Sequence, residues 1–186
     1  MEDGIRNMIL IINICKEKLH YLEFVKPIKD ILYESKIDCY VKDYDKISEI
    51  DLKNAKKVII CGTSLKDNDF VKNIDKFDWL LDYDRRILGI CGGMQIIGLV
   101  FNGKLKKETE IGHFIENFKK DFLGLKGKQE VYHLHNYYVK FLSKDFNFFT
   151  DGEIVQAVKH KDKEIYGVLF HPEVRQKDLI KNFCLL

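Results

Sequence analysis

Short apolar runs alternate with helical patterns over the first hundred residues, and this alternation limits the fold more than any other feature. The runs occupy residues 8–14, 37–44, 56–63 and 86–91. Residues 18–35 carry apolar side chains at helical spacing, and residues 67–82 are predicted as a second helix. Short runs of this kind, separated by helices, are typical of strands buried on both faces of a parallel sheet. We therefore predict an α/β fold, with a flavodoxin-like, mostly parallel central sheet and helices on both of its faces.

The pattern changes in the last third of the chain. Strand-like segments separated by short turns occupy residues 130–142, 153–160 and 164–173, and a last helix is predicted over residues 176–184. Strands that follow one another over short turns pair in antiparallel fashion, so we predict an antiparallel β extension of the sheet. No repeat, linker or low-complexity block interrupts the chain. We expect a single domain over residues 1–186.

Composition and charge argue against several kinds of partner. Hydrophobic residues make up 46% of the chain and charged residues 32%, as in folded soluble proteins. Thirty-one basic against 29 acidic side chains leave a net charge of +2, and the lysines are scattered, so we expect neither nucleic acid nor a membrane as partner. The run at residues 8–14 is too short to span a bilayer and lacks the cationic start and cleavage site of a signal peptide. We expect a cytoplasmic protein.

Neither the cysteines nor the histidines show the spacing of a metal site. The five cysteines form no CxxC pair, and four of them are interpreted as small buried apolar residues in a reducing compartment. His133 and His135 share one face of a predicted strand, but no Cys or carboxylate stands at suitable spacing, so we interpret both as structural. We expect no metal and no cofactor. The charged segments 104–114 and 119–128 are interpreted as solvated surface rather than a nucleic-acid site.

Cys91 stands at the corner between the fourth predicted strand and a helix, in the sequence "ILGICGGMQIIGLVF". Gly92 and Gly93 leave the backbone room for a sharp turn, so this is the pattern of a nucleophile elbow with sulfur in place of oxygen. The start of a helix stabilises a thiolate, and its free backbone N–H groups can hold a developing oxyanion. Gln95 lies one helical turn further on and faces the same side. A tight strand-to-helix connection without any chemistry has the same pattern.

His171 and Glu173 are candidates for the base and the orienting acid that such a thiol needs. They occur in "GVLFHPEV", at the end of a predicted strand. The proline keeps His171 out of the helical conformation, so both side chains project from extended backbone on one side. Glu173 can then hold the ring nitrogen of His171 that does not face Cys91, which gives the three roles of a nucleophilic triad. In isolation, a His-Pro-Glu sequence is as well explained by an ordinary turn with a solvated carboxylate.

The motifs "GICGGMQ" and "GVLFHPE" resemble those of the class I (triad) glutamine amidotransferases, in order and spacing over most of the chain. The resemblance implies the fold and the activity of that family. It implies that Cys91 attacks the side-chain amide of glutamine, that His171 moves the proton that releases ammonia, and that Glu173 orients His171. Water then hydrolyses the γ-glutamyl thioester to glutamate.

A segment between the two motifs also resembles the family. The sequence "YHLHNYYVK" at residues 132–140 is similar to the segment whose backbone holds the α-groups of glutamine. The resemblance implies that Asn136 and Tyr137 take those positions. We assign these two residues and Gln95 to substrate binding.

One loop departs from the family pattern. The family usually carries the sequence SGGP after its third strand, and a backbone N–H there completes the oxyanion hole together with the N–H of the residue after the cysteine, here Gly92. This chain has "CGTSLKDND" at residues 61–69, so Thr63 takes the place of the second glycine and Ser64 that of the proline. A β-branched residue makes a flip of this peptide harder. We expect either low activity or activity that depends on a partner.

The resemblance implies a glutaminase subunit that hydrolyses L-glutamine and supplies ammonia to a separate synthetase. In length and in its "GVLFHPEV" ending, the chain is similar to the free-standing glutaminase subunit of archaeal-type GMP synthetases. Two alternatives stay open: a γ-glutamyl hydrolase-type cysteine hydrolase, and a non-catalytic binding or regulatory member of the fold. The intact Cys91, His171 and Glu173 argue against the non-catalytic alternative, and the altered loop argues for it.

Overall fold

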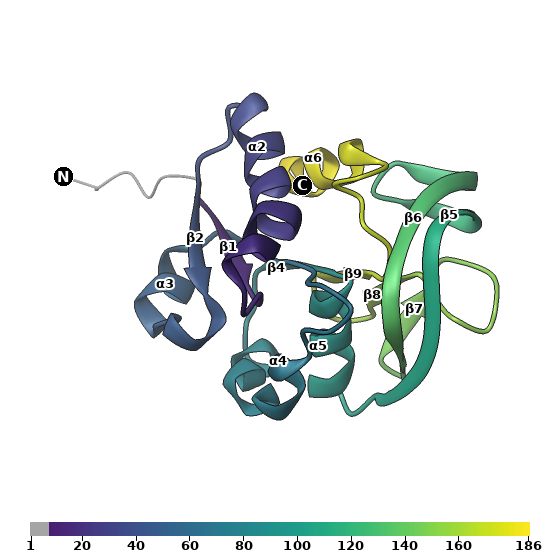
Figure 1. Ribbon diagram of the computed structural model, residues 1–186, viewed down its shortest axis with the longest axis horizontal. Helices are drawn as coiled ribbons and strands as arrows, with labels where there is room; N and C mark the ends of the chain where they lie inside the picture. Colours follow the sequence, from purple (N-terminus) through teal and green to yellow (C-terminus); the bar gives the residue numbers. More distant parts are fainter. Residues whose placement is uncertain (1–7) are drawn as a thin grey trace.

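A seven-stranded sheet forms the centre of the computed structural model, which describes residues 8–186 (Figure 1). Its strands stand in the order β2-β1-β3-β4-β9-β8-β7. They are β1 (Ile9–Asn13), β2 (Cys39–Asp43), β3 (Lys57–Ile60), β4 (Arg86–Ile90), β7 (Phe146–Phe148), β8 (Ala157–His160) and β9 (Ile165–Val168). The strands from β2 to β9 in this order pair in parallel, and β8 and β7 extend the sheet by antiparallel pairing. The predicted mostly parallel sheet with an antiparallel extension is confirmed.

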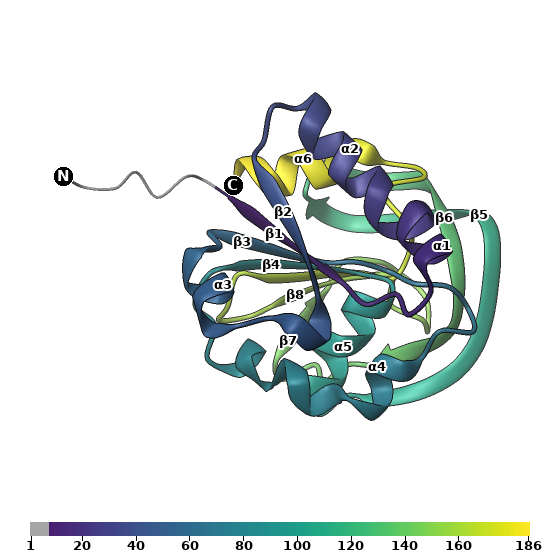
Figure 2. The ribbon, with the colours of Figure 1, turned by 60° about the vertical axis from the view of Figure 1, so that its left-hand side comes forward.

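The central strands supply two core layers, one on each face of the sheet. Every residue of β1 is buried, and its first four residues alternate between two separate apolar clusters. One face is covered by α2 (Lys26–Glu34) and α6 (Lys177–Leu185), and the other by α4 (Asp69–Lys72) and α5 (Gly92–Val100), as Figure 2 shows. Helices on both faces explain why these strands are apolar throughout rather than alternately polar.

The predicted helices differ in regularity. Helix 18–35 is confirmed as a continuous stretch of α1 (Lys18–His20), a π-helical turn (Tyr21–Val25) and α2. The helix predicted over residues 67–82 is not continuous, because α4 ends at Lys72 and a 3-10 helix (Ile74–Leu81) follows. The Asn73 side chain donates to Asp69 O at 2.9 Å, a local bond that competes with regular helix. The sequence prediction also lacks α3 (Glu49–Asn54), although Ser48 starts it with a capping box.

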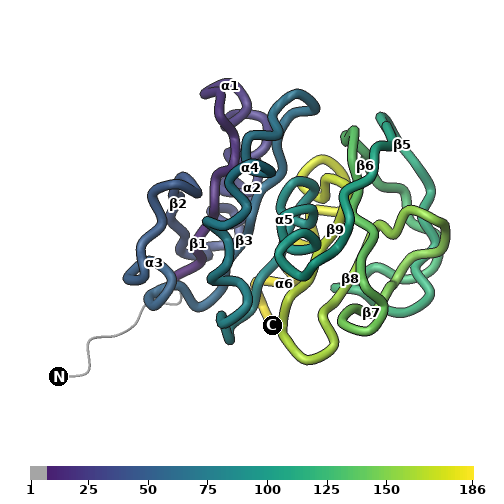
Figure 3. Tube along the Cα trace, turned by 90° about the horizontal axis from the view of Figure 1, so that it is seen from below, coloured from purple at the N-terminus to yellow at the C-terminus, as the bar shows by residue number. Residues whose placement is uncertain are grey.

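A long antiparallel hairpin of β5 (Lys104–Phe122) and β6 (Leu125–Lys140) lies beside the sheet. Figure 3 shows it on the side of β9, β8 and β7, away from β2. β6 confirms the strand predicted over residues 130–142. The charged segment 119–128 is not solvated surface throughout, because its Phe122 and Leu125 are buried in the core. Charged side chains on its exposed positions obscure the alternation that marks a half-buried strand.

Two further predictions bear on location. None of the helices within residues 8–186 is long and apolar enough to cross a membrane. The absence of a cationic start, which argued against a signal peptide, concerns residues 1–7. These residues lie outside the described range. All five cysteines are free; Cys61 and Cys184 are buried as expected, whereas Cys15 and Cys39 are only half-buried.

The packing of α5 on β3 leaves no room for a side chain at Gly93. A Cβ there would lie 2.2 Å from Ile60 O, a backbone atom that cannot move aside. We expect Gly93→Ala to lower the free energy of unfolding by about 1–3 kcal/mol, the usual cost of overpacking. Urea unfolding measures this change.

Gly167→Ala is the matched control for this prediction. A Cβ at Gly167 would meet the flexible Met94 side chain, with Cγ at 2.9 Å, and should therefore cost less. A smaller loss of stability in the Gly93 variant than in the Gly167 variant would contradict the prediction.

Candidate active site

Cys91 occupies a strained corner between β4 and α5. Its φ of 49° and ψ of −104° are unfavourable for a residue with a side chain, at a cost of about 1–3 kcal/mol. The corner is held on both sides, because Cys91 N donates to Val168 O at 2.8 Å and Gln95 N donates to Cys91 O at 3.0 Å. The strand-to-helix corner expected from the sequence is formed, and the thiol lies at the start of a nine-residue helix.

β9 carries His171 to the same edge of the sheet. Because β9 and β4 pair in parallel with their last residues opposite each other, the segments beyond them lie together. His171 N donates to Tyr132 O at 2.8 Å, which fixes this segment against β6. A Cβ at Gly62 would lie 2.7 Å from His171 Cε1 and 3.2 Å from Cys91 Cβ, so both side chains meet at this glycine.

Glu173 holds the other side of the His171 ring. Its Oε1 lies 2.7 Å from His171 Nδ1, and both side chains are buried. Nε2 is then the ring nitrogen left for Cys91, and it has no hydrogen-bond partner within residues 8–186. Burial opposes a charge on the imidazole, but the Glu173 carboxylate and the Cys91 sulfur outweigh it, so the pKa of His171 is raised well above its usual range. Phe24 packs against this ring, with 5.4 Å between centroids.

A cavity of about 10 Å³ adjoins Cys91 and collects the other residues that the sequence assigns to the site. Its lining includes Thr63, Gly92, Gln95, Asn136 and Tyr137. A space of this size holds about one water molecule and no amino acid. The site is therefore closed in this structure.

Hydrogen bonds between distant segments hold the walls of this cavity together. Gln95 Nε2 donates to Tyr137 O at 2.7 Å and links α5 to β6. Asn136 Nδ2 donates to Leu65 O at 3.1 Å and links β6 to the loop after β3. The Cys91 thiol itself points to Leu134 O, at 3.6 Å from its sulfur. Side chains that the sequence assigns to substrate binding thus contact the protein backbone in this closed state.

A pocket of about 580 Å³ lies directly outside the small cavity. The two spaces share Ser64, Leu65 and Leu134 in their linings. These three residues therefore form the wall between the outer pocket and Cys91, and we refer to them as the cavity wall. The cavity wall is the part of the lining that faces the outer pocket.

Asp67 anchors the loop that departs from the family pattern, and the sequence analysis does not single it out. Its buried Oδ2 accepts hydrogen bonds from Thr63 Oγ1 at 2.9 Å and from Lys16 N at 2.7 Å. Thr63 therefore contributes both a β-branched side chain and a hydroxyl that fixes the loop. No sequence pattern marks Asp67, because the Lys16 contact joins segments 51 positions apart.

His133 and His135 are buried on one face of β6, and the structure places beside them carboxylates that spacing along the chain does not indicate. Glu110 of β5 places Oε2 3.0 Å from His133 Nδ1 and 2.9 Å from His135 Nε2. His133 Nε2 faces Glu116 Oε1 at 3.4 Å. Spacing along the chain hides both acids, since they come from the other strand of the hairpin.

The family model for glutamine amidotransferase class-I matches residues 20–184 of this chain. A glutamine-hydrolyzing GMP synthase of Clostridium tetani is 32% identical over 163 residues, which are 81% of this chain and 32% of that protein. One subunit of a glutamine-hydrolyzing GMP synthase of Pyrococcus abyssi is 30% identical over 174 residues, which are 87% of this chain and 89% of that protein. The chain thus spans about a third of the Clostridium relative and most of the Pyrococcus relative.

Solved structures show the same fold. A protein from Thermoplasma acidophilum matches with a TM-score of 0.84 at 23% identity, covering 96% of this chain and 92% of that one. A glutamine amidotransferase from Thermotoga maritima matches with a TM-score of 0.70 at 18% identity, covering 95% and 81%. The family model spans most of the chain and the Pyrococcus relative is similar over nearly its whole length, so the chain belongs to the class I glutamine amidotransferase family.

Proposed function

We propose that this chain is a glutaminase subunit, which hydrolyses L-glutamine to glutamate and ammonia through Cys91, His171 and Glu173. The observation that carries the proposal is the strained corner at Cys91, with His171 and its Glu173 partner buried beside it. Membership of the glutamine amidotransferase family supports the same reaction.

The reaction follows from the chemistry of these three side chains. The Cys91 thiolate attacks the side-chain carbonyl carbon of glutamine, and the carbon–nitrogen bond of the amide breaks. The protonated His171 ring gives its proton to the leaving nitrogen, so ammonia departs and a γ-glutamyl thioester remains. Water then attacks the thioester while His171 takes up a proton, and glutamate is released. The raised pKa of His171 favours the protonated ring that the first step needs.

Backbone groups are proposed to stabilise the charge that develops on the substrate oxygen. Gly92 begins α5, where N–H groups have no acceptor within the helix. Gly92 and Thr63 both line the cavity at the sulfur, and we assign their N–H groups to the oxyanion hole. We assign Gln95, Asn136 and Tyr137 to binding the remainder of glutamine, in exchange for their present contacts.

We further propose that the ammonia passes to a separate synthetase, with GMP synthetase as the candidate. The Pyrococcus relative is named as one subunit of a GMP synthase, and the longer Clostridium relative is named a GMP synthase. A chain of this length that is similar to the Pyrococcus subunit over nearly all of it fits the glutaminase half of such an assembly. Its location in the cytoplasm remains a prediction.

One observation favours a second candidate, a non-catalytic member of the fold. The cavity of about 10 Å³ beside Cys91 does not admit glutamine. As a glutaminase, the chain must enlarge this cavity, and we propose that it does so by moving the cavity wall and breaking the hydrogen bond between Asn136 and Leu65. Measured turnover of glutamine separates the two candidates.

Cys91→Ala should abolish glutamine hydrolysis, because it removes the nucleophile. A glutamine analogue with an electrophilic side chain should label Cys91 in the unmodified chain, as mass spectrometry can show. Cys184→Ala is the control: burial raises the pKa of the Cys184 thiol to about 12, so this thiol is not reactive at neutral pH and its loss should leave both readouts unchanged. Labelling that persists in the Cys91 variant would identify a different nucleophile.

Glu173→Gln should lower the turnover rate and should also shift its pH profile. Loss of the carboxylate removes a charge that raises the pKa of His171, so the ring loses its proton at lower pH and the alkaline limb of kcat moves to lower pH. We expect kcat to fall by about 100-fold, the lower end of what general acid–base catalysis contributes. Glu130→Gln removes an exposed carboxylate paired with Arg175 and should change neither quantity. An unshifted alkaline limb in the Glu173 variant would argue against its role.

The isolated chain should hydrolyse glutamine slowly, and a synthetase partner should accelerate it. Thr63 donates a hydrogen bond to Asp67, and we propose that this anchor holds the oxyanion loop in an unproductive orientation. Removing one oxyanion donor costs on the order of 100-fold to 1000-fold in turnover, and a partner that restores the donor would return a similar factor. Glutamate release with and without candidate synthetase subunits measures the effect.

Two variants of Thr63 distinguish the two proposed causes of slow turnover, the β-branch and the hydroxyl anchor to Asp67. Thr63→Gly removes both the β-branch and the hydroxyl, whereas Thr63→Ser keeps the hydroxyl for Asp67. Faster turnover in both variants would assign the restraint to the β-branch, and faster turnover in Thr63→Gly alone would assign it to the anchor. Full activity of the unmodified chain, unchanged by any partner and by Thr63→Gly, would contradict the restraint.

A further inference from the structure

A register shift in the hairpin turns one carboxylate toward two buried histidines. β5 carries one extra residue before Glu110, and Glu110 then stands opposite His135 of β6. Without the shift, Glu110 would stand opposite Leu134, which points to the other face of the hairpin. Residues two apart on a strand share a face, so His133 lies on the same side as His135.

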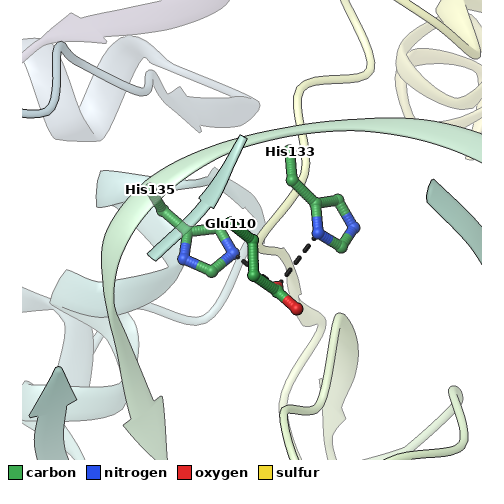
Figure 4. A group of neighbouring side chains, drawn as sticks. All are labelled: Glu110, His133 and His135. Atoms are coloured by element: carbon green, nitrogen blue, oxygen red, sulfur yellow. Dashed lines mark hydrogen bonds and ion pairs between the residues drawn. The ribbon is translucent and has the colours of Figure 1, made fainter. Parts of the chain in front are cut away.

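The three side chains converge on one point (Figure 4). Glu110 Oε2 lies 3.0 Å from His133 Nδ1 and 2.9 Å from His135 Nε2. Ligand atoms of all three residues lie within 4.8 Å of one another. Nitrogen and oxygen ligands stand about 2.0–2.1 Å from a tetrahedral Zn²⁺, hence roughly 3.3 Å from one another, so small shifts would accommodate the ion. Two imidazoles and one carboxylate form a common ligand set for zinc.

The residues around this cluster match the surroundings of a metal site. His133 Nε2, the ring nitrogen away from the cluster, faces Glu116 Oε1 at 3.4 Å, which is the outer position that carboxylates occupy behind metal-bound histidines. Gln156 Nε2 donates to Glu110 Oε2 at 2.9 Å and orients that carboxylate. Phe114 stacks on the His133 ring with 4.4 Å between centroids and fixes its plane.

Several buried polar atoms of the cluster have no hydrogen-bond partner within the described residues. The contact between His135 Nε2 and Glu110 is short but is not aligned as a hydrogen bond, and neither ring nitrogen of His135 has a hydrogen-bond partner within residues 8–186. Gln156 Oε1 is also buried without a partner in the same part of the chain. The exposed fractions are 2% for His135 and 1% for Gln156. Buried polar atoms without a partner are rare, and a coordinated cation would satisfy His135 Nε2.

The cluster is not sealed from solvent. The Glu110 side chain is 21% exposed, so an ion can reach it from solvent.

We propose that Glu110, His133 and His135 form a binding site for a divalent transition-metal ion, best matched to Zn²⁺. Glu110 Oε2, His133 Nδ1 and His135 Nε2 supply three ligands. Water takes the fourth position, or Gln156 Oε1 after rotation of its amide. The two histidines flank Leu134, whose carbonyl contacts the active-site sulfur, so the ion would fix the strand segment that closes the site. These residues would bind the ion whether or not the chain hydrolyses glutamine.

Zinc retention by a tag-free chain in a Cys91→Ala background tests the proposal. This background removes the thiol that would bind zinc together with His171. After chelator treatment, addition of Zn²⁺ and gel filtration, we expect one retained ion per chain and a higher midpoint of thermal unfolding. Glu110→Gln keeps the size of the side chain and loses the charged ligand, so it should weaken zinc binding by at least about 10-fold.

His113→Gln is the matched control, since His113 lies on the same strand with its side chain 56% exposed and should leave zinc binding unchanged. Co²⁺ gives a second readout. It is measured on the parent chain, so it does not depend on whether the Glu110 variant folds. Nitrogen and oxygen ligation predicts visible d–d absorption without the near-ultraviolet band of thiolate charge transfer. The proposal is wrong if no zinc is retained, if Co²⁺ shows the thiolate band, or if folded Glu110→Gln binds zinc as tightly as its parent.

Discussion

The parallel pairing of β4 with β9 is the interaction on which the candidate site depends. It sets Ile90 opposite Val168 and continues in the hydrogen bond from Cys91 N to Val168 O. His171 stands 80 positions after Cys91 in the chain, yet this pairing brings both to one edge of the sheet. A slip of the pairing by one residue would turn β9 over and move its side chains to the opposite faces. The hydrogen bond between His171 N and Tyr132 O then ties the hairpin to the same edge.

The sequence specifies best those parts of the fold that are buried on both sides. β1, β3 and β4 are continuous apolar runs, so their existence and parallel arrangement could be predicted. β5 could not, because its exposed charges conceal a face that reaches the core only at residues such as Phe118. The break after α4 coincides with a bond of the Asn73 side chain to Asp69 O, which helical periodicity does not reveal. The order of the strands across the sheet follows from packing of the whole chain.

The candidate site divides in the same way. Motifs and family resemblance singled out Cys91, His171 and Glu173, and the structure places these side chains together. Their catalytic roles stay a prediction. The closure of the cavity could not be predicted, since it depends on contacts between distant backbone segments, such as that of Asn136 with Leu65. The cluster of two histidines and a carboxylate depends on a one-residue shift in the β5–β6 register. The spacing of residues along a single strand does not reveal how two strands are paired.

The backbone conformation of Cys91 has a consequence for how chains of this kind diverge. Its positive φ favours glycine and costs a cysteine about 1–3 kcal/mol, a sizeable part of the 5–15 kcal/mol by which domains are usually stable. Glycine at this corner would therefore give a more stable protein that has lost its thiol. In a lineage released from selection for the thiol, drift toward glycine would meet no opposition from folding. A cysteine held in this conformation is the state that selection on chemistry, rather than on stability, maintains.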